Sequence, residues 1–278
     1  MNNSDKSRFN LSGRNALITG GGGFLGPEHG IALARYGAGI ILVDIDEEGL
    51  IRAKRRVNSQ VNGCEIETFL TDISNEHELL KLRDRLTTSD ILIDVLINNA
   101  ALNPKMENFD NITSGTVENY DMDQWEKEIR VGITGTFLCC KVFGSEMASR
   151  GKGTIVNIAS DAAIQAPDQR VYSDSGKIED VKHFKPIGYP VVKSAMLGLN
   201  RYLATYWAHC GVRVNCLIPG AVLAKQSESL VKEISKRVPL GRLAEKFEYQ
   251  EAVAFLASDA SSYMTGLELV MDGGRSIW

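Results

Sequence analysis

The sequence predicts an α/β fold in which a single parallel sheet carries helices on both faces. The chain has 278 residues, which is enough for one large domain of this class. Short, uninterrupted apolar runs alternate with longer helical patterns, and such runs suit strands buried on both faces of a parallel sheet. Alternating strands and helices with right-handed crossovers form a doubly wound sheet. With no internal repeat or linker in sight, residues 1–278 are expected to form a single domain.

Each element follows from its own apolar pattern and flanking residues. The predicted strands are residues 15–19, 40–44, 65–71, 94–98, 154–158, 212–216 and 268–271. The predicted helices are residues 25–36, 47–57, 76–86, 123–149 and the stretch from about 189 to 209. Two polar segments, residues 103–120 and 166–188, follow strand ends at the carboxyl edge of the sheet, where ligands bind in such folds. Long loops at that edge are expected to be functional.

Composition narrows the functional classes. A formal net charge of -4 gives no support for nucleic-acid binding. The chain has no apolar run long enough for a membrane span and no apolar segment near its start that would serve as a secretory signal. The five scattered cysteines form no Cys-x-x-Cys, and the four histidines have no metal-binding spacing. These features predict a cytoplasmic protein with reduced thiols, no metal and a small-molecule substrate.

A glycine-rich turn between the first strand and the first helix predicts a dinucleotide site. Residues 19–26 read Thr-Gly-Gly-Gly-Gly-Phe-Leu-Gly. Glycines let the backbone approach a pyrophosphate closely, and the following helix N-terminus favours its negative charge. The candidate cofactor contacts in this turn are Gly20, Gly23, Phe24, Leu25 and Gly26.

Asp44 ends the second predicted strand, where a carboxylate would accept hydrogen bonds from the adenosine ribose and repel a 2′-phosphate. Residues 45–48 contain neither Arg nor Lys, so NAD (NADH) is predicted to be preferred over NADP. The alternative interpretation is that Asp44 only caps the helix that follows.

Tyr189 and Lys193 predict proton-transfer chemistry. Lying four residues apart, they share one face of a helix. Free tyrosine has a pKa of about 10, and a fixed ammonium nearby would lower it toward neutral pH. Ser160, just after the strand at 154–158, is placed to hold a substrate oxygen beside the phenol. Together the three side chains could move a proton on or off an alcohol or carbonyl oxygen. The alternative is a buried tyrosine and a solvated lysine on an ordinary helix.

As a set, these motifs resemble the short-chain dehydrogenase/reductase family over residues 11–274. The further matching motifs are Asp72-Ile73, Asn98-Asn99-Ala100, Pro219-Gly220, residues 239–242, residues 255–259 and residues 265–274. The resemblance implies a Rossmann fold, with Tyr189 as acid/base and with Tyr189 and Lys193 also at the nicotinamide ribose. It further implies that Asp72 and Ile73 contact adenine, that Asn99 and Ala100 line the cofactor, and that Pro219 to Val222 flank the nicotinamide. Family members are commonly homotetramers, so a dimer or tetramer through residues 123–149 and 189–209 is expected.

The sequence departs from the family pattern at several positions. The glycine spacing is more typical of the larger sugar-nucleotide branch. Gly132 stands where the family usually has an asparagine that positions a water in the proton relay, and Ala224 replaces a threonine that often follows Pro-Gly. The proton relay is therefore expected to run differently in this chain.

The spacing between serine and tyrosine also departs from the family pattern. Tyr172 lies at the usual distance from Ser160, yet the residue four positions later is Gly176, and Lys177 would lie off the same face. We therefore assign the acid/base role to Tyr189. Residues 172–188 are interpreted as an insertion over the active site, and the active-site insertion as a whole is placed at about 161–188.

The stretch at 160–170 with the inserted loop resembles a subgroup called flagellin modification protein A, associated with nonulosonic-acid sugars in bacteria. This resemblance implies a carbohydrate substrate: a sugar, a sugar phosphate or a nucleotide sugar. Asp161 and Arg170 are candidate substrate residues. Arg170, Lys182, His183 and Lys185 could hold a phosphate or carboxylate, although each could instead be a solvated loop residue.

Three functional hypotheses remain open. The first is an NAD(H)-dependent oxidoreductase interconverting a secondary alcohol and a ketone, as expected for bacterial surface or flagellar sugar biosynthesis. The second is a sugar epimerase or dehydratase that retains its NAD, to which the glycine spacing points. The third is a non-catalytic, NAD-sensing protein, against which the intact Ser160, Tyr189 and Lys193 argue.

Overall fold

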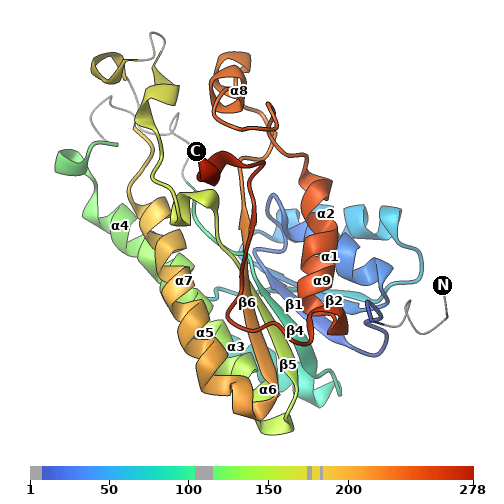
Figure 1. Cartoon of the computed structure of the whole chain (residues 1–278). Coiled ribbons are helices and arrows are strands. Elements are labelled where there is room, and N and C mark those ends of the chain that lie inside the picture. The colour runs from blue at the N-terminus through green and yellow to red at the C-terminus, as the bar shows by residue number, and fades with distance from the viewer. Residues whose placement is uncertain (1–7, 104–114, 174–176, 182–183) are drawn as a thin grey trace.

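A computed structural model of the chain describes residues 8–103, 115–173, 177–181 and 184–278 (Figure 1). Within these residues, seven strands form one sheet in the order β3-β2-β1-β4-β5-β6-β7, and every neighbouring pair is parallel. The strands are β1 Asn15–Thr19, β2 Gly39–Asp44, β3 Ile66–Leu70, β4 Ile93–Asn98, β5 Gly153–Ile158, β6 Val212–Pro219 and β7 Glu268–Met271. The predicted doubly wound parallel sheet is confirmed.

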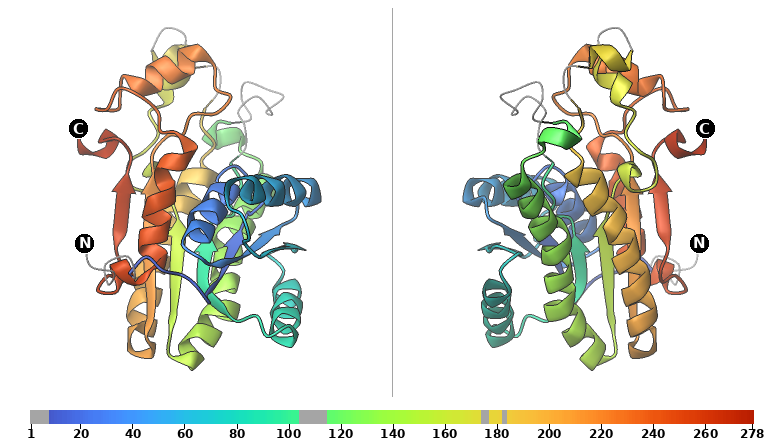
Figure 2. Two further views of the ribbon diagram at one scale, coloured as in Figure 1. Left: turned by 90° about the vertical axis from the view of Figure 1, so that its right-hand side faces the viewer. Right: turned by 90° about the vertical axis from the view of Figure 1, so that its left-hand side faces the viewer.

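Helices cover both faces of the sheet (Figures 1 and 2). One face packs against α1 Gly26–Arg35, α2 Glu47–Gln60 and α9 Gln250–Ala257. The other face packs against α3 Glu76–Thr88, α5 Thr136–Cys139, α6 Ser145–Arg150 and α7 Gly188–Trp207. Side chains that alternate along the strands divide between these two cores, because successive residues of a strand point to opposite faces. No helix in the described part of the chain is long and apolar enough to cross a bilayer.

The strand order reverses at β1, which pairs with β2 on one side and with β4 on the other. Ligands of doubly wound sheets bind outside the carboxyl ends of the strands at such a reversal. The glycine-rich turn follows β1, Asn99 follows β4 and Ser160 lies just beyond β5. The topology therefore gathers these predicted site segments at one edge of the sheet.

The long helix expected over residues 123–149 is interrupted in its hydrogen bonding. A continuous helical run begins with α4 Met122–Ile129 and ends with α6, but Arg130–Gly135 and Cys140–Gly144 are wider π-helical turns. Gly132 and Gly135 lie in the first of these turns, where Thr136 Oγ1 donates to the Gly132 carbonyl at 2.8 Å. Such turns often occur at functional sites.

Three further differences concern the end of β6 and two helices. Strand β6 continues to Pro219 instead of ending at Cys216, because its last residues pair with β7. Two helices were not predicted as elements: α9, a short apolar helix in the core, and α8 Glu228–Ser235. The latter contributes Ser229, Leu230 and Lys232 to the cavity described below.

Candidate active site

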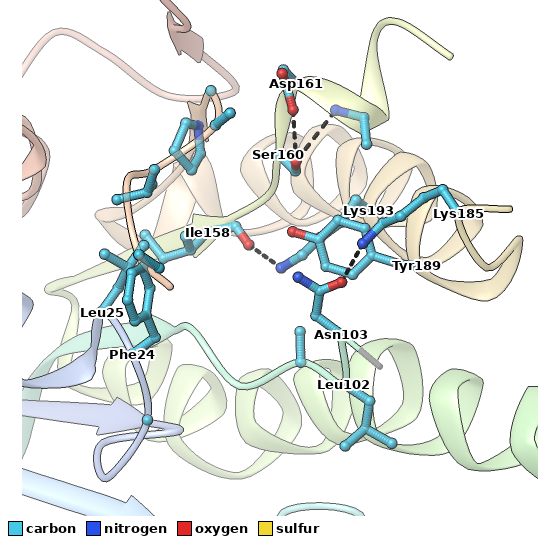
Figure 3. A pocket seen from close by; sticks show the side chains of 18 of the residues that line it. Phe24, Leu25, Leu102, Asn103, Ile158, Ser160, Asp161, Lys185, Tyr189 and Lys193 are labelled. Atoms are coloured by element: carbon cyan, nitrogen blue, oxygen red, sulfur yellow. Dashed lines mark hydrogen bonds between the residues drawn. The ribbon is translucent and has the colours of Figure 1, made fainter. Parts of the chain in front are cut away.

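A cavity of about 1740 Å³ opens at the carboxyl edge of the sheet (Figure 3). This exceeds the roughly 300–1,000 Å³ of a typical small-ligand pocket, so a dinucleotide and a substrate can lie in it together. Nearly every predicted site residue lines it: Gly20, Gly23, Phe24, Leu25, Asp44, Asp72, Ile73, Asn99, Ala100, Ser160, Asp161, Tyr189, Lys193, Pro219 and Val222. Gly26 and Arg170 do not. In the described residues, no group of three or more His, Cys, Asp or Glu is placed to hold a metal ion.

The glycine-rich turn is tightly packed on its inner side and open toward the cavity. Gly20 has φ +62°, and a Cβ there would lie 2.8 Å from Ala100 Cα. A Cβ on Gly26 would lie 2.5 Å from the Gly20 carbonyl oxygen, so Gly26 permits close packing of α1 instead of facing the cavity. Helix α1 begins at Gly26 with no side-chain cap, which leaves its first N–H groups available to an anion. These features fit a pyrophosphate.

Asn99 ties the glycine-rich turn to β4. Its Nδ2 donates to the carbonyls of Thr19 at 3.0 Å and Gly20 at 3.1 Å, and its Oδ1 lies 3.2 Å from Nε2 of buried His29. Burial lowers the pKa of His29 to about 4, so this imidazole is neutral at physiological pH. Asn99 thus borders the cavity while its amide holds the turn in shape.

Asp44 is held by backbone donors at the end of β2. Its Oδ2 accepts from the Gly22 N–H at 3.0 Å, and its Oδ1 accepts from Ile45 and Asp46. The cap of α2 is Asp46, which accepts from the Gly49 N–H at 3.0 Å. The alternative interpretation of Asp44 as the helix cap is therefore wrong, and its carboxylate borders the cavity.

Tyr189 and Lys193 project from the first turns of α7 on the opposite side of the cavity from Phe24 and Leu25 (Figure 3). Lys193 is only 3 % exposed. Its Nζ lies 5.8 Å from the centroid of the Tyr189 ring and donates to the Ile158 carbonyl at 2.6 Å. The spacing in the sequence thus brings the two side chains to one wall, beside Ser160 at the end of β5.

The electrostatics of this pair differ from the expectation of a lowered phenol pKa. Burial raises the pKa of Tyr189, Ser160 lowers it and the charge of Asp161 raises it, with a net upward shift. Burial also lowers the pKa of Lys193 to about 8. An amine stabilises a phenolate only while it is protonated, so burial of both groups argues against the expectation that Lys193 lowers the pKa of Tyr189 toward neutral pH.

Gly132 packs against α7, the helix that carries Tyr189 and Lys193. A Cβ on Gly132 would lie 2.3 Å from Val192 Cγ1 on α7. The space into which a larger side chain would project is therefore filled by Val192, and an asparagine at this position does not fit the packing.

Tyr172 also lines the cavity, but Lys177 is exposed and outside it, whereas Lys193 lies inside with Tyr189.

The described residues of the segment 161–188 form part of the cavity wall. Pro167, Asp168, Tyr172, Ser173 and Lys185 line it. Lys185 Nζ lies 4.6 Å from the Tyr189 ring centroid, and burial lowers the pKa of this lysine to about 8.

Lys185 is also held in place. Its Nζ donates to Asn103 Oδ1, and its backbone N–H donates to Gln169 Oε1 at 2.8 Å. Among the predicted cations, Arg170 does not line the cavity and instead pairs with Asp168, and Lys182 and His183 lie outside the described residues.

Two arginines in the cavity wall were missed by sequence reasoning. Arg275 pairs with Asp161, although the two residues are separated by 114 positions. Arg237, just beyond α8, donates from Nε to Asp168 Oδ2 at 2.8 Å. Neither arginine belongs to a local motif, so only the folded chain identifies them.

Comparisons with known proteins agree with this architecture. Residues 25–276 match the family model described as enoyl-(acyl carrier protein) reductase. D-threitol dehydrogenase of Mycolicibacterium smegmatis is 30 % identical over 97 % of this chain and 95 % of its own length. A 3-alpha-(or 20-beta)-hydroxysteroid dehydrogenase of Mycobacterium bovis is 31 % identical over 95 % of this chain and 90 % of its own.

Solved structures are similar over almost the whole chain. A gluconate 5-dehydrogenase from Burkholderia cenocepacia in complex with NADP and tartrate has a TM-score of 0.84 at 27 % identity, covering 99 % of both chains. An NAD⁺-bound xylitol dehydrogenase has a TM-score of 0.81 at 26 % identity, covering 95 % of this chain and 99 % of that one. Together with the family model and the curated relatives, these likenesses show that the chain belongs to the short-chain dehydrogenase/reductase family of oxidoreductases.

Proposed function

We propose that this protein is an NAD(H)-dependent oxidoreductase that interconverts a secondary alcohol and a ketone on a carbohydrate. The observation that carries the proposal is that one cavity joins two sites. The glycine-rich turn and Asp44 border one part, and Ser160, Tyr189 and Lys193 border another. A redox cofactor can thus act on the carbon, and a proton-transfer group on the oxygen, of the same substrate carbon–oxygen bond.

The nicotinamide, when bound, supplies or accepts the hydride. In alcohol oxidation, the phenolate of Tyr189 would take the hydroxyl proton, and in ketone reduction the phenol of Tyr189 would give a proton to the carbonyl oxygen. Ser160 holds the substrate oxygen. Lys193 would hold the cofactor ribose and, while charged, would favour the phenolate. The Ile158 carbonyl, at 2.6 Å from Lys193 Nζ, orients the ammonium.

The preference for NAD rests on Asp44. Its carboxylate borders the cavity and is fixed by three backbone N–H donors, so it cannot easily turn away from a ribose. A 2′-phosphate would face this negative charge, whereas two ribose hydroxyls would donate to it. Arg52 lies nearby on α2 but pairs with Asp46 and Glu48.

A carbohydrate substrate is supported by the polar lining of the cavity and by the relatives. Gln165, Ser173, Gln226 and Ser229 also line the cavity, where they can hydrogen-bond a substrate with many hydroxyls. The relatives include dehydrogenases named for threitol, gluconate and xylitol. Lys185 offers a cation for a carboxylate or phosphate. A role in bacterial surface sugar biosynthesis stays a hypothesis from the subgroup resemblance.

We also infer a homo-oligomer built through α7 and the helical run before it. Tyr202 and Tyr206 on α7 are 64 % and 56 % exposed and stack at 5.8 Å. Phe137 on α5 is exposed as well. Exposed aromatic side chains on neighbouring helices are typical of an interface. In this proposal residues 161–188 form an active-site insertion within a single domain.

The test combines cofactor titration with a substrate panel. NADH and NADPH binding are measured by fluorescence, and nicotinamide absorbance is followed with polyols, sugars, sugar acids and sugar phosphates. Tight NADH binding with turnover of one sugar class supports the proposal, and Tyr189→Phe should keep binding but lose most turnover. NADH binding without net redox change would instead favour an NAD-retaining epimerase or dehydratase, or a sensor. Preferred NADPH would contradict the interpretation of Asp44.

A further inference from the structure

The hydroxyl of Ser160 has one proton and more than one acceptor within reach. Its Oγ donates to Asp161 Oδ1 at 3.0 Å and accepts from the Ala162 N–H at 3.2 Å. The same hydroxyl lowers the pKa of Tyr189, as a donor to the phenol oxygen does. A serine hydroxyl carries a single donor hydrogen. Asp161 therefore competes with the substrate oxygen and with Tyr189 for the proton that Ser160 must donate.

Arg275 weakens this competitor. It donates from Nη1 to Asp161 Oδ2, the oxygen that Ser160 does not use. Asp161 is 5 % exposed, and the side chain of Arg275 is 17 % exposed. Charges that are largely removed from water interact strongly. The guanidinium therefore offsets most of the carboxylate charge and makes Asp161 a weaker acceptor for Ser160.

The C-terminal segment delivers Arg275 to the cavity, and Figure 1 shows this end of the chain among the loops at the carboxyl edge. Asp272 accepts from the Gly274 N–H at 2.9 Å and from the Ser276 N–H at 2.8 Å. Gly274 has φ +89°, and Trp278 Nε1 donates to the Arg237 carbonyl at 3.1 Å. These contacts hold the turn around Arg275 without using its guanidinium.

We propose that Arg275 is a positioning residue of the active site, which neutralises Asp161 and so leaves the hydroxyl proton of Ser160 available to the substrate oxygen. The proposal rests on the proposed alcohol–ketone chemistry. Without Arg275, Asp161 would retain the Ser160 proton and present an unbalanced negative charge to Tyr189. Both effects would weaken proton transfer.

The groups that face Tyr189 set the direction of each effect. Lys193 on α7 and Lys185 before α7 are the cations, Asp161 is the carboxylate, and Ser160 is the neutral donor. Because an anion raises the pKa of a phenol, removing Arg275 should raise the pKa of Tyr189. Neutralising Asp161 should lower it. A purely structural role for the pair would not produce opposite shifts.

The kinetic test is a double-mutant cycle of Arg275→Gln and Asp161→Asn, with Arg275→Lys as the charge-conserving variant. Arg275→Gln should lower kcat on the order of ten- to hundred-fold, with NADH affinity unchanged. The double variant should be more active than Arg275→Gln alone, because the damage acts through Asp161. Arg275→Lys should retain more activity than Arg275→Gln. The control is Arg14→Gln, which removes a cation from an ion pair with Asp259 outside the cavity.

Activity like the wild type in Arg275→Gln would overturn the proposal. So would a double variant no better than Arg275→Gln, since Arg275 would then act independently of Asp161.

A second readout needs no substrate. Phenolate absorbance is titrated in each variant, and the Tyr189 component is taken as the part lost in Tyr189→Phe. The Tyr189 titration should move to higher pH in Arg275→Gln and to lower pH in Asp161→Asn, while melting curves confirm that both variants fold. Unchanged titrations in both would overturn the coupling. If the Tyr189 titration shifts in opposite directions in the two variants but no substrate is turned over, the coupling of Arg275 and Asp161 to Tyr189 is supported. The alcohol–ketone chemistry of the proposed function is then contradicted.

Discussion

Replacing Gly132 by alanine tests the packing that separates this chain from the usual family pattern. The new Cβ would lie 2.3 Å from Val192 Cγ1, well inside the contact distance of about 3.5–4.0 Å between carbon atoms. Val192 is 3 % exposed and β-branched, so it has little freedom to turn aside. Overpacking costs about 1–3 kcal/mol, and a contact this short belongs in the upper part of that range, about 2–3 kcal/mol, while replacing glycine in a helix returns about 1 kcal/mol. We expect Gly132→Ala to lower the free energy of unfolding by about 1–2 kcal/mol.

The assay is denaturant unfolding at fixed cofactor concentration, with three companions. Val192→Ala alone removes two buried carbon groups and should cost about 1.6 kcal/mol at about 0.8 kcal/mol per group. The double variant should be more stable than the sum predicts, because the methyl group added at position 132 enters the vacated space. Gly198→Ala, on α7 with nothing within 4 Å of its Cβ, should gain up to about 1 kcal/mol. The reasoning is refuted if Gly132→Ala matches or exceeds wild-type stability, or if the double variant is additive.

Four further predictions concern cofactor, charge, substrate and assembly. Asp44→Asn should narrow the preference for NADH over NADPH in binding titrations; an unchanged ratio would locate the discrimination elsewhere. Burial lowers the pKa of Lys193 from 10.5 to about 8. Between pH 8 and 10.5, Lys193 binds a proton in the unfolded chain but not in the folded chain, so its contribution to the free energy of unfolding rises with pH in this range. Cofactor-free Lys193→Met should thus exceed the wild type in stability below pH 8 and lose that advantage toward pH 10.5; a constant difference in unfolding free energy would contradict this. Lys185→Gln should reduce kcat/KM for sugar acids or phosphates about ten-fold or more beyond the loss for neutral polyols, which share only its effect on Tyr189; equal losses would argue against an anion contact. Tyr202→Glu with Tyr206→Glu should shift sedimentation toward the monomer, whereas an intact oligomer would place the interface elsewhere.

The strand and helix pattern was predictable because its causes lie close together along the chain. Continuous apolar runs identified the buried strands, and the glycines after β1 identified the turn that packs against Ala100 and α1. The Tyr189 and Lys193 spacing placed two side chains on one helix face whatever the rest of the chain did. Local spacing did not show how side chains and backbone pack around these motifs. Gly26 packs against the Gly20 carbonyl, and Val192 fills the space beside Gly132.

Local pattern and family resemblance therefore sufficed for the sheet, the glycine-rich turn, Asp44 at its strand end and the placing of Tyr189 and Lys193 on one wall of the cavity. Only folding decided which charges reach the cavity. Arg170, inside the predicted loop, turned to Asp168, while Arg275 came from the far end of the chain to Asp161. Folding also decided the direction of the Tyr189 pKa shift, because burial depends on every segment packed around the phenol. Motifs depend on spacing along the chain, whereas desolvation and ion pairing depend on distance in space.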